Sequence, residues 1–340
     1  MTSHSIVRFG VIGAGRIGKL HAENLATRIP GAEVLAIADP LVGAARELAA
    51  RLHVPKAVAD YKELLADPAI DAVAICSSTD THAALIIEAA RAGKQIFCEK
   101  PIAVVVDRID AALAAVKQAG VSLQIGFNRR FDPNFRKVRT MIAEGSVGDV
   151  HILRITSRDP APPPIEYVKV SGGIFYDMTI HDFDMARYLT GSEVEEVYVA
   201  GGVRVDPRIG EPGDFETAVI TLKFASGAIG TIDNSRQAVY GYDQRVEVFG
   251  SKGMVAVANN TPDTHVFSTS DGVHSAKPLY FFLERYNESF IAEMREFVDA
   301  VQNGTPTPVT GSDGRAPVLI AKAATLSCRE KRPVRIAEVS

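Results

Sequence analysis

The chain has 340 residues, of which 46% are hydrophobic and 23% are charged, and its formal net charge at pH 7 is −4. This length is sufficient for two domains with separate cores, and the composition is typical of a globular protein. The small negative net charge disfavours nucleic acid and anionic membranes as partners. No run of about 20 apolar residues is present that could span a bilayer.

The amino-terminal residues and the cysteines together indicate a reducing compartment. Residues 1–15 lead directly into an apolar strand and contain no long apolar segment of a secretory signal. Cys76, Cys98 and Cys328 are odd in number and far apart, which is typical of a protein that lacks disulfides. No group of cysteines and histidines has the spacing of a zinc site, so we expect a cytoplasmic protein without a bound metal.

Strands and helices are expected to alternate between residues 7 and 126, the pattern of βαβ units around a parallel sheet. The expected strands are Val7–Ile12, Val34–Ala38, Ala72–Cys76, Gln95–Cys98 and Leu123–Gly126. The expected helices are Ile17–Ala26, Gly43–Leu52, Ala83–Arg91 and Arg108–Ala119.

A glycine-rich motif, G-A-G-R-I-G at residues 13–18, joins the first expected strand to the first expected helix. Such glycines permit a tight turn, a close approach of the backbone to a pyrophosphate, and close packing of helix on strand. The free N–H groups at the start of the helix then bind the phosphates. We therefore predict cofactor contacts for Gly13, Gly15, Arg16, Ile17 and Gly18, with an ordinary glycine turn as the alternative.

The second expected strand ends at Asp39, where this fold places the carboxylate that binds the adenosine ribose. An aspartate accepts hydrogen bonds from both ribose hydroxyls and repels a 2′-phosphate. The next residues, Pro40 and Leu41, provide no arginine to bind such a phosphate. The sequence therefore predicts NAD rather than NADP.

Polar residues also follow the third expected strand, at the sheet edge where ligands bind in open α/β folds. Ser78, Thr79 and His82 can contact the ribose or nicotinamide part of the cofactor. They can equally begin the next helix, with Thr81 or Asp80 as its cap. Both roles remain open.

Glu99-Lys100-Pro101 follows the fourth expected strand and directs Lys100 toward the same edge. A lysine there can transfer a proton or bind a reacting oxygen. A surface lysine at a strand–helix turn is the alternative. We also predict a cis Lys100–Pro101 peptide, because only proline makes a cis bond inexpensive.

Residues 172–189, GGIFYDMTIHDFDMARYL, combine an apolar helical pattern with Asp177 and His181. In a continuous helix, side chains four residues apart share one face. A carboxylate in that position can orient an imidazole and tune it as a general base. A buried helix in which His181 bonds to Asp177 for structural reasons is the alternative.

The rest of the chain shows alternating apolar and polar residues followed by two helical patterns. The expected strands are Val150–Thr156, Glu195–Val205, Thr217–Phe224, Ala228–Asn234, Arg245–Gly250 and Gly253–Asn259. The expected helices are Phe282–Gln302 and Asp313–Glu330.

The glycine motif, E-K-P at 99–101 and the Asp177/His181 segment, in this order and at these separations, resemble the glucose–fructose oxidoreductase/inositol dehydrogenase family over nearly the whole chain. Three further segments, at 126–133, 156–160 and 240–245, resemble the inositol 2-dehydrogenases of that family in particular. The resemblance implies an α/β fold with two domains. The first, residues 1–126, is a Rossmann domain with a doubly wound parallel sheet.

The second implied domain, residues 127–340, binds substrate and forms the oligomer. It is an open, mainly antiparallel sheet with helices on one face, and its last helix packs back on the first domain. The resemblance also implies a homo-oligomer, either a tetramer or a dimer.

The resemblance further implies a catalytic trio of Lys100, Asp177 and His181. The implied reaction is NAD-dependent oxidation of myo-inositol at the 2-hydroxyl to 2-keto-myo-inositol, with either His181 or Lys100 as the base. Glu99 and Lys100 are added to the cofactor contacts. Implied substrate contacts, each with a structural hydrogen bond as the alternative, are Arg130, Asp159 and Tyr240. A dehydrogenase of another inositol isomer, sugar or polyol and a non-catalytic dinucleotide-binding sensor remain as alternative functions.

Overall fold

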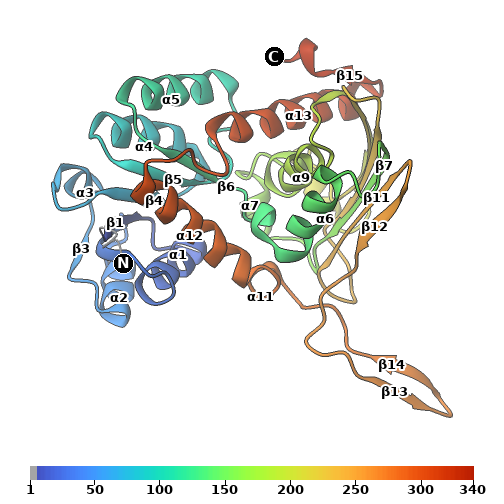
Figure 1. Cartoon of the computed structure of the whole chain (residues 1–340), viewed down its shortest axis with the longest axis horizontal. Coiled ribbons are helices and arrows are strands. Elements are labelled where there is room, and N and C mark those ends of the chain that lie inside the picture. The colour runs from blue at the N-terminus through green and yellow to red at the C-terminus, as the bar shows by residue number, and fades with distance from the viewer. Residues whose placement is uncertain (1–5) are drawn as a thin grey trace. The chain divides into compact units, whose positions relative to one another are not determined.

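The computed structural model describes residues 6–340 and contains two compact units (Figure 1). The first unit consists of the chain up to Asn128 together with Glu288–Val318. The second consists of Arg129–Asn287 and Leu319–Ser340. The sequence placed everything after residue 126 in the second domain, whereas the structure returns Glu288–Val318 to the first unit. An amphipathic pattern shows that a helix covers an apolar surface but does not show which one.

The first unit is built on a six-stranded sheet in the order β3-β2-β1-β4-β5-β6, and all of its strand pairs are parallel. The strands are β1 (Val7–Ile12), β2 (Ala32–Ala38), β3 (Lys56–Val58), β4 (Ala72–Ile75), β5 (Gln95–Glu99) and β6 (Leu123–Gly126). This order is that of the doubly wound dinucleotide-binding fold, so the predicted Rossmann domain is confirmed. The sequence did not predict β3, because three half-buried residues show no periodicity.

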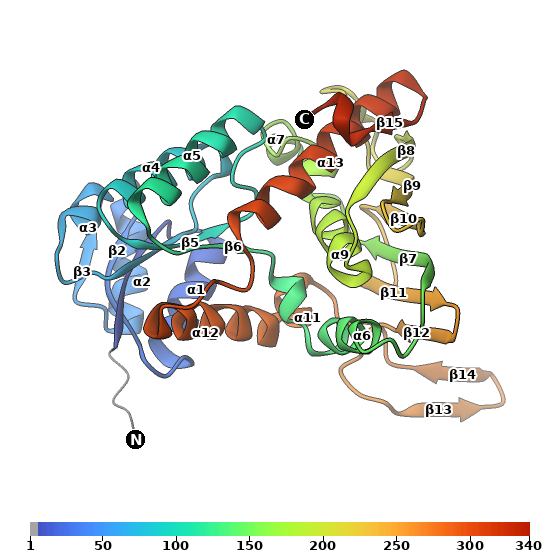
Figure 2. The same ribbon diagram turned by 45° about the horizontal axis from the view of Figure 1, so that its top comes forward.

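Helices cover this sheet and connect its strands (Figure 2). They are α1 (Arg16–Thr27), α2 (Val42–Leu52), α3 (Lys62–Ala66), α4 (Thr79–Arg91), α5 (Val106–Ala119) and α12 (Asn287–Asn303). In α12, the Phe297 ring lies 6.1 Å from the ring of Phe9 and 6.0 Å from that of Phe97. All three rings are buried, so α12 completes the core of the first unit although it lies far along the sequence.

Helix α4 begins four residues before the predicted start. Its N-cap is Ser78, so the expectation that Thr81 or Asp80 caps this helix is wrong. Thr79 to His82 instead form the first turn, because the polar residues after β4 adopt helical geometry before the apolar pattern begins.

The second unit contains a seven-stranded sheet in the order β12-β11-β7-β10-β9-β8-β15. The strands are β7 (Val150–Arg158), β8 (Val194–Gly202), β9 (Thr217–Phe224), β10 (Ile229–Ser235), β11 (Asp243–Gly250), β12 (Gly253–Val257) and β15 (Val334–Arg335). Only the β10–β7 pair is parallel, so the predicted mainly antiparallel sheet is confirmed. One face is apolar and buried, as Leu153, Ile220 and Val248 illustrate.

The helical segments of the second unit are short, apart from three. They are α6 (Pro133–Ala143), α7 (Ile165–Val168), α8 (Ile174–Asp177), α9 (Ile180–Thr190), α10 (Pro207–Gly210), α11 (Phe282–Arg285) and the carboxyl-terminal part of α13 (Gly311–Glu330), with the 3₁₀ turn η2 (Ile336–Glu338). A further 3₁₀ turn, η1 (Asn128–Phe131), spans the boundary between the units. The predicted helix Phe282–Gln302 is interrupted at Tyr286.

A two-stranded hairpin, β13 (Val266–Thr269) and β14 (Gly272–Ser275), extends from the second unit (Figure 1). The sequence analysis did not predict this hairpin. Its side chains at Val266, Phe267 and Val273 are more than half exposed. Among the described residues, no helix has the length and apolar character needed to cross a membrane.

Candidate active site

The three motif glycines between β1 and α1 meet different steric requirements. Gly13 has φ +104°, and a Cβ there would lie 2.6 Å from the carbonyl oxygen of Cys76. A Cβ at Gly18 would lie 2.0 Å from the carbonyl oxygen of Gly13, so this glycine allows α1 to pack closely. Gly15 has no heavy atom within 4 Å of its Cβ position. The open side at Gly15, at the N-terminus of α1, can therefore accommodate a pyrophosphate.

Asp39 lies at the end of β2 and is fixed by two main-chain donors. Its Oδ2 accepts from the N–H of Ala14 at 2.8 Å, and its Oδ1 accepts from the N–H of Leu41 at 2.8 Å. The carboxylate is thus attached to the glycine loop itself. Each oxygen has a further lone pair, so the group can still bind ribose hydroxyls. Arg16 and Ile17, the other predicted contacts on this loop, form the first turn of α1.

His82 is buried and connects the loops after β4 and β5. Its Nδ1 lies 2.8 Å from the carbonyl oxygen of Pro101, and its Nε2 lies 3.1 Å from that of Ser77. The peptide between Lys100 and Pro101 is cis, as predicted. These bonds favour a structural role for His82, while cofactor contacts of His82, Ser78 and Thr79 remain predictions. Lys100 itself directly follows β5 and is partly exposed.

The carboxylate of Asp177 accepts hydrogen bonds from two side chains of the second unit. Both Nη1 and Nη2 of Arg236 donate to Asp177 Oδ2 at 3.1 Å, and the Tyr167 hydroxyl donates to Oδ1 at 2.8 Å. The Arg236 side chain is only 2% exposed, so the ion pair is shielded from water. Arg236 and Tyr167 were not predicted as partners of Asp177. They lie 59 and 10 residues away from it in the chain, and no sequence motif connects them with it.

The segment that carries Asp177 and His181 is two helices rather than one. Helix α8 ends at Asp177 and α9 begins at Ile180. The N–H of Thr179 donates to the carbonyl of Ile174, five residues earlier, which is a π-type turn. The prediction of one continuous helix is therefore wrong, and the four-residue spacing argument does not hold across this turn. Such turns occur frequently at functional sites.

Asp159, one of the three predicted substrate contacts, lies in the electrostatic field of this ion pair. Burial raises the pKa of the Asp159 carboxyl to about 6. The positive charge of Arg236 opposes this rise, and the negative charge of Asp177 adds to it. Asp159 therefore shares its surroundings with the predicted catalytic carboxylate.

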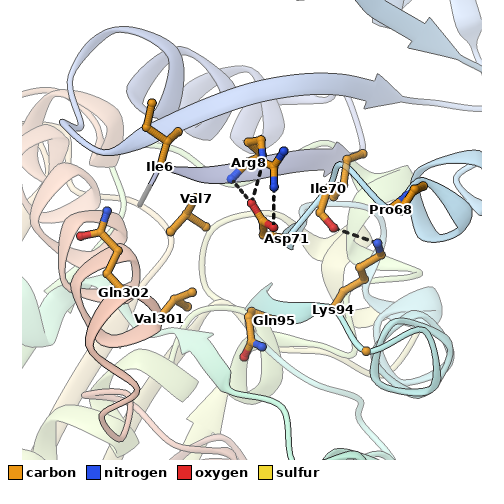
Figure 3. Close-up of a pocket in the computed structure, with 11 residues that line it drawn as sticks. Ile6, Val7, Arg8, Pro68, Ile70, Asp71, Lys94, Gln95, Val301 and Gln302 are labelled. Carbon is orange, nitrogen blue, oxygen red and sulfur yellow. Dashed lines mark hydrogen bonds and ion pairs between the residues drawn. The ribbon is translucent and has the colours of Figure 1, made fainter. Parts of the chain in front are cut away.

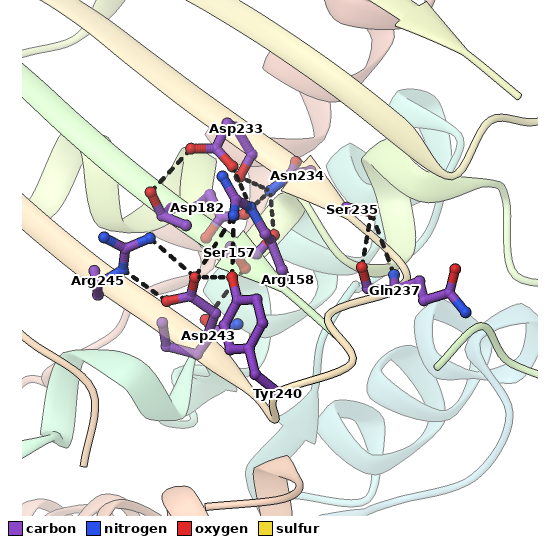
Figure 4. A network of polar contacts seen from close by, with 12 residues as sticks. Ser157, Arg158, Asp182, Asp233, Asn234, Ser235, Gln237, Tyr240, Asp243 and Arg245 are labelled. Carbon is purple, nitrogen blue, oxygen red and sulfur yellow. Dashed lines mark hydrogen bonds and ion pairs between the residues drawn. The ribbon is translucent and has the colours of Figure 1, made fainter. Parts of the chain in front are cut away.

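Arg130 and Tyr240, the other two predicted substrate contacts, are bound by other side chains. Arg130 donates to Asp184 through Nε and Nη2, with its shortest contact at 2.6 Å, and both residues are buried. The Tyr240 hydroxyl donates to Asp243 at 2.6 Å and accepts from Arg158 Nη1 at 3.0 Å (Figure 4). These contacts favour the structural alternative for both residues.

Arg129, rather than its neighbour Arg130, belongs to the polar network on the inner face of the sheet. Its Nη1 donates to Asp182 Oδ1 at 2.6 Å, and Asn234 donates to the other oxygen of Asp182 at 2.9 Å. Arg129 Nη2 also lies 3.4 Å from the hydroxyls of Ser157 and Tyr242. The sequence could not separate two adjacent arginines, because their side-chain directions depend on the 3₁₀ turn that carries them.

A cavity of about 460 Å³ in the first unit is lined by residues such as Arg8, Asp71 and Gln95 (Figure 3). It opens at the amino ends of β1, β4 and β5, where Arg8 forms an ion pair with Asp71 at 3.0 Å. The glycine loop and Asp39 lie at the opposite, carboxyl ends of the parallel strands. This cavity is therefore not a candidate for the cofactor.

Comparison with known proteins identifies the same architecture. Residues 7–127 match the model of an oxidoreductase family with an NAD-binding Rossmann fold, and residues 135–256 match the GFO/IDH/MocA C-terminal domain. The chain is 52% identical to a myo-inositol 2-dehydrogenase of Thermotoga maritima, over 98% of this chain and 99% of the relative. It is 47% identical to an inositol 2-dehydrogenase of Rhizobium meliloti, over 97% and 99%.

Solved structures agree with these relatives. A probable dehydrogenase of Thermotoga maritima superposes with a TM-score of 0.96 at 52% identity, covering 98% of this chain and 100% of the other. A myo-inositol dehydrogenase of Lactobacillus casei, in complex with NAD(H) and myo-inositol, superposes with a TM-score of 0.88 at 26% identity, covering 97% and 96%.

The raised pKa of Asp159 predicts a pH-dependent stability effect. In the folded protein the pKa of Asp159 is about 6, whereas in the unfolded chain the carboxyl has its ordinary pKa of 3.8, so stability falls as the pH rises through this window. Asp159→Asn removes the titration and should therefore gain stability over the wild type between pH 4 and pH 8, by on the order of 2 kcal/mol. Urea unfolding at both pH values measures this difference.

Asp271→Asn, an exposed substitution on the hairpin, is the control and should show no such dependence. If Asp159→Asn changes the free energy of unfolding equally at both pH values, the carboxyl is not held in the surroundings described here.

Proposed function

Because the chain belongs to the GFO/IDH/MocA oxidoreductase family, we propose that it oxidises myo-inositol at the 2-hydroxyl to 2-keto-myo-inositol with NAD. The observation that carries this proposal is the likeness over nearly the whole chain to relatives named inositol 2-dehydrogenase, at 47% and 52% identity. Because these likenesses cover 97% or more of this chain and 99% of each relative, they include the substrate domain as well as the Rossmann fold.

The residues present fit NAD. Gly15 leaves an open side at the start of α1, and Asp39 is held at the end of β2 by two main-chain donors. A carboxylate in this position favours two ribose hydroxyls and repels a 2′-phosphate. NAD, when bound, supplies the hydride acceptor.

The chain must supply the proton chemistry, because the pKa of an alcohol is far above neutral pH. His181 accepts the hydroxyl proton in this proposal, and Lys100 hydrogen-bonds the reacting oxygen and stabilises its developing negative charge. The reverse assignment of the base, to Lys100, remains the alternative. Asp177 is the orienting carboxylate, and Arg236 and Tyr167 hold it in place.

The proposed reaction is tested by NADH absorbance with myo-inositol, scyllo-inositol, glucose and a blank without substrate. We expect turnover with myo-inositol and a drop of about a hundredfold or more in Lys100→Met, because a proton-handling group is lost. The dissociation constant for NAD should change little. Lys62→Met, at an exposed lysine of the same unit, is the control.

Turnover of Lys100→Met within a few-fold of the wild type would contradict the role of Lys100. NAD binding without turnover of any of the three compounds would contradict the proposed reaction and favour the non-catalytic sensor or a dehydrogenase of another sugar or polyol.

The carboxylate of Asp39 predicts cofactor preference. We expect kcat/KM with NAD to exceed that with NADP by a wide margin, because Asp39 repels the additional phosphate. Asp39→Ala should narrow this margin, because it weakens the binding of NAD and removes the carboxylate that repels NADP. Steady-state kinetics with both cofactors measures this ratio of kcat/KM values. Equal kcat/KM with NAD and NADP in the wild type would rule out the role of Asp39 in cofactor preference.

We also propose that the protein is a cytoplasmic homo-oligomer, a tetramer or a dimer, assembled through the sheet of the second unit. Four adjacent strands place Met254, Phe249, Ile152 and Ile229 opposite one another in register. These side chains are between 37% and 55% exposed, so they form an apolar row on the outer face. Such a row favours burial against another protein surface.

A charge in this row should prevent assembly. Phe249→Asp is expected to lower the mass measured by light scattering to that of a smaller species, because a carboxylate cannot be buried there unpaired. Val105→Asp is the control, since Val105 is similarly exposed, at 47%, and precedes helix α5, where aspartate is favourable. An unchanged mass in Phe249→Asp would exclude this face as the interface.

A further inference from the structure

Three ionisable side chains from distant parts of the sequence meet in the interior of the first unit. They are His21 of α1, Glu99 at the end of β5 and Glu293 of α12, and one candidate ligand atom of each lies within 4.8 Å of the others. His21 and Glu293 are fully buried, and Glu99 is 8% exposed. The mechanism proposed above uses neither His21 nor Glu293.

The closest contact in this cluster is between His21 Nε2 and Glu99 Oε1, at 2.6 Å. This distance corresponds to a short hydrogen bond between the imidazole and the carboxylate. Aromatic rings surround the imidazole, because the ring of Phe97 lies 4.9 Å away and that of Phe290 lies 5.7 Å away, both edge-on. The bond is therefore formed in a region of low polarity, where it is strong and where its loss is costly.

Stability alone does not account for such a cluster. Buried ionic groups are expensive to desolvate, and apolar side chains of similar volume are often as stabilising or more so. A fixed geometry is the property that a buried ionic network provides and an apolar contact does not.

The cluster fixes the residue immediately before Lys100. Glu99 is the last residue of β5, and its carboxylate lies over Gly126, where a Cβ would be 3.0 Å from Glu99 Oε2. On the other side of Lys100, the carbonyl of Pro101 is bound by His82 at 2.8 Å. The main chain that carries Lys100 is thus held by a histidine on each side.

His21 also links Lys100 to the cofactor loop. Helix α1 begins directly after Gly15, so His21 lies about one turn beyond the predicted phosphate-binding segment. The His21–Glu99 bond connects this helix to the end of β5. Glu293 adds α12 to the same network, although Glu293 lies 194 residues after Glu99 in the chain.

From this arrangement we infer that His21 and Glu293 are positioning residues, which hold Glu99 and through it the main chain of Lys100 in the geometry that proton handling requires. The inference rests on the proposed function, in which Lys100 contacts the reacting oxygen. A displacement of about 1 Å in a catalytic group can reduce turnover about a hundredfold, so a buried bond one residue away is enough to matter.

A direct hydrogen bond explains the 2.6 Å contact between His21 and Glu99 better than a metal ion bridging them does. Nitrogen and oxygen ligands of zinc lie about 2.0–2.2 Å from the ion, so two of them in a tetrahedral site are farther from each other than a hydrogen-bonded pair. His21 Nε2 and Glu99 Oε1 are only 2.6 Å apart, which leaves no space for an ion between them. The metal content of the purified protein is therefore part of the test. One tightly bound metal per chain, lost in Glu293→Gln, would overturn the inference.

The kinetic test compares two replacements of the same histidine in the full-length protein. His21→Leu removes the donor, and we expect kcat for myo-inositol to fall by about 10- to 100-fold while the NAD dissociation constant changes by less than about threefold. His21→Gln retains an N–H at a similar reach and should recover kcat to within about fivefold of the wild type. Glu293→Gln should lower kcat, whereas Asp299→Asn, an exposed loss of charge on the same helix, should not.

A second measurement does not depend on any substrate. The rate at which an amine-acylating reagent labels Lys100, followed by peptide mass spectrometry from pH 6 to 10, reports on the position and surroundings of its amine. We expect the labelling rate of Lys100 to change at least threefold in His21→Leu. In His21→Gln this rate should return toward that of the wild type. The exposed Lys62 serves as the internal reference.

The two measurements separate the failure of each idea. If the wild type oxidises no polyol but Lys100 labelling still responds to His21, the proposed function fails and the positioning role stands. If His21→Leu leaves both kcat and labelling unchanged, or if His21→Gln gives no recovery and NAD binding falls in parallel, the cluster does not position Lys100. Should His21→Leu fail to fold, Glu293→Gln decides the question: a changed labelling rate of Lys100 in this variant would support the positioning role, and an unchanged rate would overturn it.

Discussion

Each strand of the first sheet runs parallel to its neighbours, so the chain leaves all of them at the same edge. This constraint gathers the glycine loop after β1, Asp39 after β2, the polar segment after β4 and Lys100 after β5. None of these groups is near another in the sequence, and no specific contact is needed to assemble them. Two hydrogen bonds then fix what the topology brings together: Asp39 accepts from the glycine loop, and His82 binds the carbonyl of Pro101 after β5.

The second unit depends on buried charge rather than on strand direction. Arg129 and Arg236 are almost fully buried, and each is paired with an aspartate, Asp182 or Asp177. Such pairs contribute little net stability, because the desolvation of both partners offsets their attraction. Their value here is geometric, since a carboxylate that accepts from an arginine and a tyrosine, as Asp177 does, has a defined orientation. The same charges hold a second carboxyl, Asp159, in surroundings that raise its pKa.

The path of the chain between the two units explains how a remote segment reaches the interior of the first. After the hairpin, the chain returns to the first unit at Glu288, and α12 packs the ring of Phe297 against Phe9 of β1 and Phe97 of β5. A helix that covers an apolar face has no need of a buried glutamate. Glu293 on that face, beside His21 and Glu99, is therefore an observation that packing does not explain and that a role beside Lys100 does.

The sequence by itself determined the features that local rules control: the strand–glycine–helix motif, Asp39 at a strand end, Lys100 before a cis proline, and the alternation that marks both sheets. Periodicity and turn chemistry are short-range, so these predictions needed no knowledge of the fold. Only the tertiary structure decided which of two adjacent arginines enters the polar network, where α12 docks, and how the helix containing Asp177 is interrupted. Arg236, Tyr167 and Glu293 had no signal in the sequence, because a contact between residues tens or hundreds of positions apart leaves no local pattern. Side-chain direction and long-range contact are set by packing, and packing exists only in the folded chain.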